Sequence, residues 1–228
     1  MNKELFSRSI GLLGENNFNL IQDKAIAIFG LGGVGGTALE ALARTGFQHF
    51  IIVDFDKVDP SNLNRQILYT AKDIGRNKVE VAKERIVSIN SGVDIKAFQC
   101  KAQEFDFKQK IDFIVDAIDD ADGKLFLGKM AQQLNVPFVM SLGMANRFNP
   151  EQVRVNKLNQ TRNDPLAKKM RYLAKKANLD LSKINVVISE ELPQKNAEKL
   201  YSIMMVPSAA GLTIAKFILN SIIDKKQN

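Results

Sequence analysis

The sequence predicts an α/β protein with a doubly wound, Rossmann-like parallel sheet that antiparallel strands extend in its C-terminal half. Three observations predict this fold. Apolar runs of strand length alternate with segments of helical periodicity, a glycine-rich turn joins the first such strand to the first such helix, and the pattern changes after Gly143. Strands that alternate with helices form parallel sheets with right-handed crossovers.

The first half contains five apolar runs that we interpret as buried strands. Between them lie three segments whose apolar residues recur at helical spacing, and glycine or asparagine stands at the ends of these segments. The predicted strands are KAIAIF (24–29), FIIVDFD (50–56), DIKAFQC (94–100), IDFIVDAID (111–119) and VPFVMSLG (136–143). The predicted helices are TALEALARTG (37–46), KVEVAKERIVSIN (78–90) and GKLFLGKMAQQLN (123–135).

The second half contains shorter pieces of mixed type. We expect a turn and edge strand over 148–158, a basic amphipathic helix over 164–179, a strand over 184–191 and an apolar helix over 206–223. These pieces are too small to form a core of their own. We therefore predict one domain over 1–228, divided into a half at about 20–143 and an extension of the same sheet at about 144–228.

Composition excludes several classes of protein. No apolar run approaches the roughly 20 residues of a membrane span, and the N-terminus lacks the apolar stretch of a secretory signal. The single cysteine, Cys100, and the single histidine, His49, are too few for a zinc site or an internal disulfide. We expect a cytoplasmic protein without zinc. The net charge of +7 is compatible with a polyanionic partner, although excess lysine also serves solubility.

The turn GLGGVG at 30–35 predicts a nucleotide site. Gly30 and Gly32 permit a tight turn and a close approach of the backbone to a phosphate, and Gly35 lets the helix pack near its strand. With Gly33, they place the amides of a helix N-terminus toward an anion. The half at about 20–143 is therefore the predicted nucleotide-binding half.

The polar residues that follow distinguish a triphosphate from a dinucleotide. Asp54 ends the second strand, where a carboxylate accepts hydrogen bonds from ribose hydroxyls. A triphosphate carries more charge than a helix terminus neutralises, and Arg65 and Lys78 supply the additional cations. The predicted nucleotide-binding set also includes neighbouring polar residues, namely Asp56, Asn64 and Gln66. Asp56 is equally compatible with a solvated loop.

Asp116 lies at the end of the fourth predicted strand, the edge at which open α/β sheets bind ligands. A carboxylate there is suited to holding Mg²⁺ through oxygen. Asp119 and Asp120 are better explained as helix caps. The predicted cofactors are ATP and Mg²⁺.

Together, GLGGVG, VDFDKVDPSNLNRQ, GRNKVEVAKERIVSIN and VDAID resemble the nucleotide site of the ubiquitin-activating-type adenylating enzymes, in order and spacing. The resemblance implies that Asp54 contacts ribose, that Asn64, Arg65, Gln66 and Lys78 contact phosphates, and that Asp116 holds magnesium. It also implies a homodimer in which Arg8 reaches the partner's ATP site. These roles make Arg8, Arg65, Lys78 and Asp116 the predicted catalytic residues.

The C-terminal half is similar to a cysteine-poor branch of that superfamily, the tRNA threonylcarbamoyladenosine dehydratases. The similar segments are TRNDPLAKKMRYLAKK, ISEELP and PSAAGLTIAKF. This resemblance implies adenylation of the threonyl carboxylate of a modified adenosine beside the anticodon, followed by ring closure. The alternatives are adenylation of the C-terminal glycine of a ubiquitin-like sulfur carrier, a nicotinamide-binding protein and a non-catalytic RNA-binding module. A cysteine desulfurase and its sulfur acceptor are further candidate partners.

Basic residues of the extension are the predicted contacts to tRNA. They form a cluster that can neutralise several phosphates, although a solvated helix face explains the same pattern. The predicted contacts are Arg147, Arg162, Lys168, Lys169, Arg171, Lys175 and Lys176.

Overall fold

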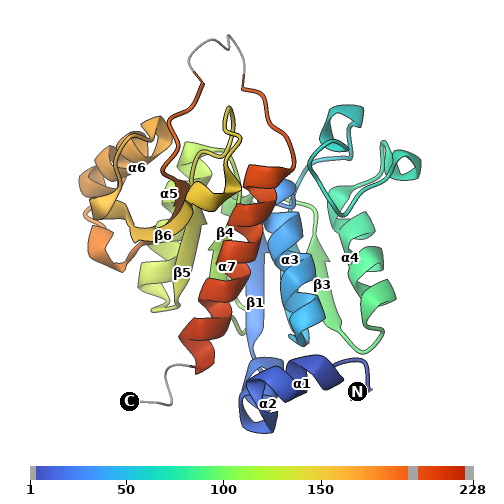
Figure 1. The fold of residues 1–228 in the computed structure, drawn as a ribbon. Helices are drawn as coiled ribbons and strands as arrows, with labels where there is room; N and C mark the ends of the chain where they lie inside the picture. The colour runs from blue at the N-terminus through green and yellow to red at the C-terminus, as the bar shows by residue number, and fades with distance from the viewer. Residues whose placement is uncertain (1–3, 195–199, 224–228) are drawn as a thin grey trace.

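The structure is a computed structural model that describes residues 4–194 and 200–223. Its centre is one seven-stranded sheet with the strand order β3-β2-β1-β4-β5-β7-β6, covered by helices on both faces (Figure 1). The strands are β1 (Ala25–Phe29), β2 (His49–Val53), β3 (Asp94–Phe98), β4 (Phe113–Asp116), β5 (Phe138–Ser141), β6 (Val153–Lys157) and β7 (Asn185–Ser189). The α-helices are α1 (Ser7–Leu13), α2 (Glu15–Gln22), α3 (Gly33–Thr45), α4 (Lys78–Ile89), α5 (Ala121–Gln133), α6 (Pro165–Lys176) and α7 (Met205–Ile223). Short 3₁₀ turns cover Pro60–Asn62, Ala71–Asp73, Ala102–Glu104, Pro150–Gln152, Leu158–Gln160 and Leu181–Lys183.

The predicted fold class is confirmed. Strands β1 to β5 run parallel to one another, and β7 pairs with β5 in the same direction. Among the strands of the described residues, β6 alone runs antiparallel, against β7 at the edge of the sheet. The extension therefore contributes one more parallel strand than the sequence indicated. The helices α1 and α2 were not predicted; Phe6 and Phe18 anchor them with ring centroids 5.7 Å apart.

Chain order reverses between β1 and β4, because β2 and β3 lie on one side of β1 and β4, β5 and β7 lie on the other. The loops that leave the carboxyl ends of β1 and β4 therefore diverge to opposite faces of the sheet. This switch point is where doubly wound sheets bind ligands.

Contrary to the expectation that no apolar run approaches the length of a membrane span, the final helix, α7, is long and apolar enough to cross a membrane by length and composition alone. In this fold one of its faces packs against α3 inside the domain (Figure 1). A Cβ atom at Gly211 would stand 2.5 Å from the Val34 carbonyl oxygen, so only glycine allows this close approach. The buried stripe of α7 consists of Val206, Pro207, Ala210, Gly211, Ile214, Ala215 and Ile218.

Candidate active site

The glycine turn is shaped by two contacts that exclude side chains. Gly30 has a φ of +88°, and a Cβ atom there would lie 2.6 Å from the Ala117 carbonyl oxygen. At Gly35 a Cβ atom would lie 1.9 Å from the Gly30 carbonyl oxygen. Helix α3 then begins after Gly32 without a side-chain cap. Its first-turn amides are thus available to an anion, as the sequence predicts.

Asp54 follows β2 and braces this turn. Its carboxylate accepts hydrogen bonds from the main-chain amides of Leu31 at 2.6 Å and Asp56 at 2.8 Å. Burial raises the pKa of Asp54, and nearby Lys78 opposes the rise. In the structure this carboxylate bonds to the backbone of the turn and its neighbourhood. Its contact with a ribose stays a prediction.

Tyr69 supports the other side of the turn, and sequence reasoning missed it. Its buried hydroxyl donates to the Leu31 carbonyl oxygen at 2.9 Å. Burial raises the pKa of Tyr69, so the phenol remains a donor at neutral pH. Its only signal was an aromatic residue three positions after Gln66 in a polar loop.

The predicted phosphate contacts lie in the loop after the Pro60–Asn62 turn. Arg65 donates to the Ser61 carbonyl oxygen at 2.6 Å and to the Asn64 side chain at 3.0 Å. This loop touches the glycine turn, since a Cβ atom at Gly33 would lie 2.9 Å from the Arg65 carbonyl oxygen. Gln66 is buried, and within the part of the chain that the structure describes its side-chain oxygen has no hydrogen-bond partner. The loop therefore holds polar groups directly beside the predicted anion site.

Lys78 opens α4 and is almost completely buried. Its ammonium group lies 2.8 Å from the Asp56 carboxylate, which is half exposed. The Lys78 amide also donates to the Asp56 carbonyl oxygen at 3.0 Å. Asp56 is therefore the counter-ion of Lys78 in this structure, which gives the predicted nucleotide-site residue a definite partner.

Asp116 ends β4 in a fully buried environment. One carboxylate oxygen lies 2.9 Å from the ammonium group of Lys124, which is itself fully buried and also donates to the Ser141 carbonyl oxygen at 2.7 Å. The second oxygen, Oδ2, is buried and has no hydrogen-bond partner among the described residues. Burial raises the pKa of Asp116, and Lys124 opposes this effect.

Sequence reasoning missed Lys124, although a signal was present. Lys124 falls on the same helical stripe as the buried Leu127, Gly128 and Ala131 of α5. A lysine on a buried stripe requires a buried partner. The neighbouring Asp120 is the N-cap of α5, as expected, and the bond from the Gly123 amide lowers its pKa.

The residues near Asp116 could hold a magnesium ion only if phosphates of a bound nucleotide supplied further oxygen ligands. In the described residues, no group of three or more His, Cys, Asp or Glu side chains is placed to hold a metal. Asp116 nevertheless keeps one oxygen free of partners from residues 4–194 and 200–223. Magnesium in nucleotide sites is commonly held by one or two carboxylates plus substrate phosphates, so the orphaned oxygen is compatible with the prediction.

Arg8, a predicted catalytic residue, and Cys100, the single cysteine, both lie outside this group of side chains. Arg8 is exposed on α1, at the end of the sheet opposite the glycine turn of its own chain (Figure 1). Cys100 packs partly against the core, and burial raises the pKa of its thiol, which disfavours a nucleophilic role.

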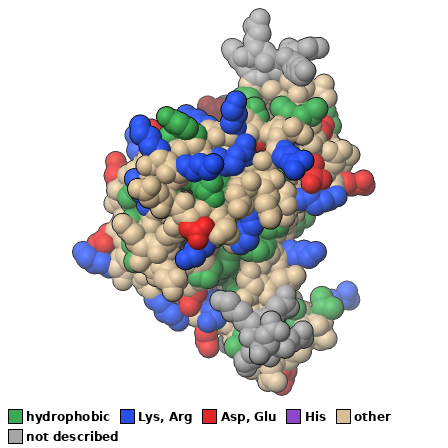
Figure 2. Space-filling model, turned by 90° about the vertical axis from the view of Figure 1, so that its left-hand side faces the viewer, with side chains coloured by type: hydrophobic (Ala, Val, Ile, Leu, Met, Phe, Trp, Pro, Cys, Tyr) green, Lys and Arg blue, Asp and Glu red, His purple; other side chains and the backbone are tan. Residues whose placement is uncertain are grey.

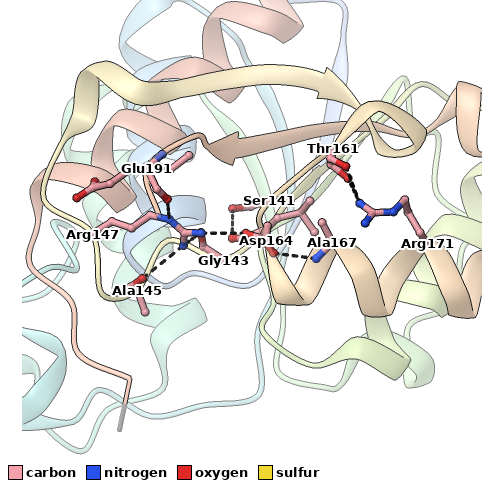
Figure 3. Close-up of polar contacts among 11 residues, drawn as sticks. Ser141, Gly143, Ala145, Arg147, Thr161, Asp164, Ala167, Arg171 and Glu191 are labelled. Atoms are coloured by element: carbon pink, nitrogen blue, oxygen red, sulfur yellow. Dashed lines mark hydrogen bonds and ion pairs between the residues drawn. The ribbon is translucent and has the colours of Figure 1, made fainter. Parts of the chain in front are cut away.

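The basic helix α6 presents most of its predicted tRNA contacts to solvent. Lys and Arg side chains gather across the upper part of the side of the molecule that carries it (Figure 2). The exposed ones among the predicted residues are Arg162, Lys168, Lys169, Lys175 and Lys176. Arg171 is half-buried. Its guanidinium donates hydrogen bonds to the Thr161 hydroxyl and, at 2.9 Å, to the Thr161 carbonyl oxygen (Figure 3).

The prediction for Arg147 is wrong. This side chain is buried, and its guanidinium lies 3.2 Å from the Asp164 carboxylate and 2.9 Å from the Glu191 carbonyl oxygen (Figure 3). It also donates to the Gly143 carbonyl oxygen. The sequence places Arg147 in the loop after β5 but does not indicate in which direction its side chain points. In the structure the side chain points inward and pairs with the buried Asp164 carboxylate. Arg147 therefore joins segments within the protein and is not free to meet a phosphate.

Known proteins of the same kind share this architecture. The tRNA threonylcarbamoyladenosine dehydratase of Bacillus subtilis is 32% identical over 82% of this chain and 75% of its own length. The Escherichia coli enzyme of the same name is 34% identical over 74% of this chain and 65% of its own length. The crystal structure of E. coli tRNA N6-threonylcarbamoyladenosine dehydratase in complex with ATP matches with a TM-score of 0.91, at 29% identity, over 99% of this chain and 96% of that one.

The family comparison covers nearly the entire described chain. The pattern of the ThiF family matches residues 6–225, from the helix that precedes the sheet to the end of α7. The glycine turn, the buried Asp116 and the basic extension all lie inside that span. The chain belongs to the ThiF family.

Proposed function

We propose that this protein is an ATP-dependent tRNA threonylcarbamoyladenosine dehydratase. One observation carries the proposal: the glycine turn contacts both Ala117, next to Asp116, and the backbone of Arg65. The predicted anion-binding turn, the loop that carries Arg65 and the end of β4 that carries Asp116 thus lie together at one end of the sheet. The matching E. coli dehydratase has been solved with ATP and with AMP, the two nucleotides that a carboxylate-adenylating cycle consumes and releases.

The chemistry requires positioning and charge neutralisation more than proton transfer. The threonyl carboxylate is ionised at neutral pH, so it attacks the α-phosphate without a general base. Pyrophosphate leaves and an acyl-adenylate forms. The carbamoyl group of the same nucleoside then attacks the activated carbonyl, loses a proton and displaces AMP with the former carboxylate oxygen. The net change in the nucleoside is the loss of one water.

Arg65 and Lys78 supply positive charge to the phosphates in this proposal. Arg65 stands on an open loop, from which it can turn toward a ligand, whereas Lys78 is held by Asp56. Preorganised cations stabilise the charge that develops on transferring phosphoryl groups. Asp116 would hold magnesium through Oδ2, and the metal when bound would neutralise phosphate charge. Asp54 would keep the turn in shape and contact the ribose.

The exposed lysines of α6 would bind the tRNA backbone. Their charge accords with a polyanionic substrate. We also propose a homodimer in which Arg8 acts in the partner's site, since Arg8 is remote from the site of its own chain. A cytoplasmic location, where tRNA is modified, and a sulfur-transfer system as partner complete the proposal.

Pyrophosphate release tests this function. Purified protein with magnesium and ATP should release pyrophosphate when tRNA carrying threonylcarbamoyl-adenosine is added, and not with the same tRNA lacking that modification. Release with a carrier protein that ends in Gly-Gly, but not with tRNA, would assign the activity to the sulfur-carrier alternative. The variant Arg65→Ala serves as a control for nucleotide-dependent background.

A further inference from the structure

Two exposed aromatic side chains stand on segments that meet beside the candidate active site. Phe148 follows the loop after β5 and is 59% exposed, and Tyr201 precedes α7 and is 63% exposed. Single exposed apolar residues are ordinary in proteins. These two differ because the backbone that carries them is held by a dense set of hydrogen bonds.

Asn146 joins the two segments. Its main-chain amide donates to the Tyr201 carbonyl oxygen at 2.7 Å, and its side-chain oxygen accepts from the Tyr201 amide at 2.8 Å. Its carbonyl oxygen accepts from the Gln194 amide at 2.8 Å. Asn146 adopts a φ of +58°, a conformation that asparagine tolerates better than most residues. It thereby binds both the chain that leaves β7 and the chain that enters α7.

Phe148 is fixed from the other side. Its amide and that of Asn149 donate to the Glu191 carboxylate at 3.0 Å and 2.8 Å. Arg147, the residue before Phe148, reaches across to Asp164, which caps the first turn of α6 by accepting from the Ala167 amide at 2.8 Å (Figure 3). The buried arginine thus ties the segment that carries Phe148 to the N-cap residue of the basic helix.

Tyr201 is linked to the nucleotide loop. The side-chain amide of Asn64 donates to the carbonyl oxygen of Ser202 at 2.8 Å. Asn64 is the neighbour of Arg65 and also accepts a bond from it at 3.0 Å. The backbone that carries Tyr201 is thus tied to the predicted phosphate loop, and the backbone that carries Phe148 is tied through Arg147 to the N-cap of the predicted tRNA helix.

We infer that Phe148 and Tyr201 form a stacking surface for unpaired bases of the tRNA substrate next to the modified adenosine. The inference rests on the proposed function and specifies how that substrate is held. Aromatic side chains bind single-stranded nucleic acid by stacking on bases, while nearby cations follow the backbone. Exposed lysines on α6 supply those cations, and they favour RNA over an apolar protein partner. The hydrogen bonds around Asn146 preorganise the surface, so little ordering is needed on binding.

The test uses variants that retain apolar bulk but lose the ring. Phe148→Leu and Tyr201→Leu are compared with Phe148→Tyr and Tyr201→Phe, which keep it. The probe is a labelled anticodon stem-loop RNA that carries threonylcarbamoyl-adenosine, and a fully paired RNA duplex of equal length is the reference. Leu134→Ala, which alters a 42% exposed residue at the C-terminal end of α5, is the matched control.

Each leucine variant should bind the stem-loop about tenfold more weakly. The ring-retaining variants, the control, duplex binding and ATP binding should be unchanged. The salt dependence should also keep its slope, because no phosphate contact is lost.

Unchanged stem-loop affinity in both leucine variants would overturn the inference, even if the wild-type enzyme dehydrates tRNA. A shift of those variants from dimer to monomer in sedimentation, with RNA binding intact, would instead identify an interface between two copies and overturn it as well. Failure of the wild-type protein to bind the RNA or to release pyrophosphate with it, despite ATP binding, would refute the proposed function itself.

Discussion

The nucleotide half and the C-terminal extension use polar residues in different ways. At the carboxyl edge of β1, β2 and β4, the predicted residues Asp54, Lys78 and Asp116 are buried and held by backbone or by a counter-ion. On α6, most of the predicted residues are exposed. The buried cation of the extension, Arg147, connects segments of the chain. In the nucleotide half, buried polar residues form the candidate active site itself. In the extension, the buried polar residue holds together the backbone that carries the exposed basic residues.

The largest expected loss of stability comes from breaking the buried ion pair between Asp116 and Lys124 in the nucleotide half. Lys124→Met would leave the Asp116 carboxylate buried without its cation, so we expect a loss of about 3 to 5 kcal/mol in the free energy of unfolding at neutral pH. Burial already raises the pKa of Asp116, and removal of Lys124 would raise it further. The native state then binds the proton more tightly than the unfolded state. The destabilisation relative to the wild type should therefore grow as pH rises through the interval between the two native-state pKa values of Asp116, both of which lie above the unfolded value of about 3.9, and shrink as pH falls below that interval.

Denaturant unfolding across that pH range measures the effect. The double variant Lys124→Met/Asp116→Asn, which removes both charges, should recover most of the stability. A single variant as stable as the wild type at every pH would show that the pair contributes nothing to folding.

A somewhat smaller effect is expected for the buried arginine of the extension. Arg147→Met would leave Asp164 buried and unpaired and would free the carbonyl oxygens of Gly143 and Glu191, at a cost of about 2 to 4 kcal/mol. Hydrogen exchange should show reduced protection in α6. The control is Arg162→Met, which alters an exposed arginine of the same region and should change neither quantity. Equal behaviour of the two variants would remove the distinction between the two kinds of arginine.

Arg65→Ala should affect binding rather than folding. Hydrogen bonds to charged groups contribute about 1.5 to 3 kcal/mol, so calorimetric titration should show ATP affinity about 10- to 100-fold lower. The free energy of unfolding should stay within about 0.5 kcal/mol of the wild type, as for most surface substitutions. Lys108→Ala, an 85% exposed lysine, is the control for charge alone. Equal ATP affinities in the two variants would contradict the phosphate role.

The smallest effect belongs to individual exposed lysines of α6. Lys168→Ala and Lys175→Ala should each lower the slope of log affinity for tRNA against log salt by about 1, with a modest loss of affinity at low salt. Fluorescence anisotropy over a salt series measures it. Slopes that match the wild type in both variants would mean that this helix face is merely solvated.

The sequence predicted the strands of the sheet and the position of the glycine turn, whereas the roles of the site residues stay predictions. Strands, the glycine turn and Asp54 follow from backbone constraints, and backbone constraints leave local patterns. Lys124, Tyr69 and Asn146 act through partners 8, 38 and 55 residues away, so their contacts depend on tertiary packing. For Arg147 the same dependence on tertiary packing misled the prediction. A basic residue in a loop is expected at the surface, but the fold brings the buried Asp164 beside it.

Mass spectrometry of nucleosides from tRNA incubated with the protein tests the central claim most directly. With ATP and magnesium, threonylcarbamoyl-adenosine should lose the mass of one water, and it should remain unchanged without ATP or with Arg65→Ala. An unchanged nucleoside mass with wild-type protein that demonstrably binds ATP would contradict the assignment of tRNA as the substrate.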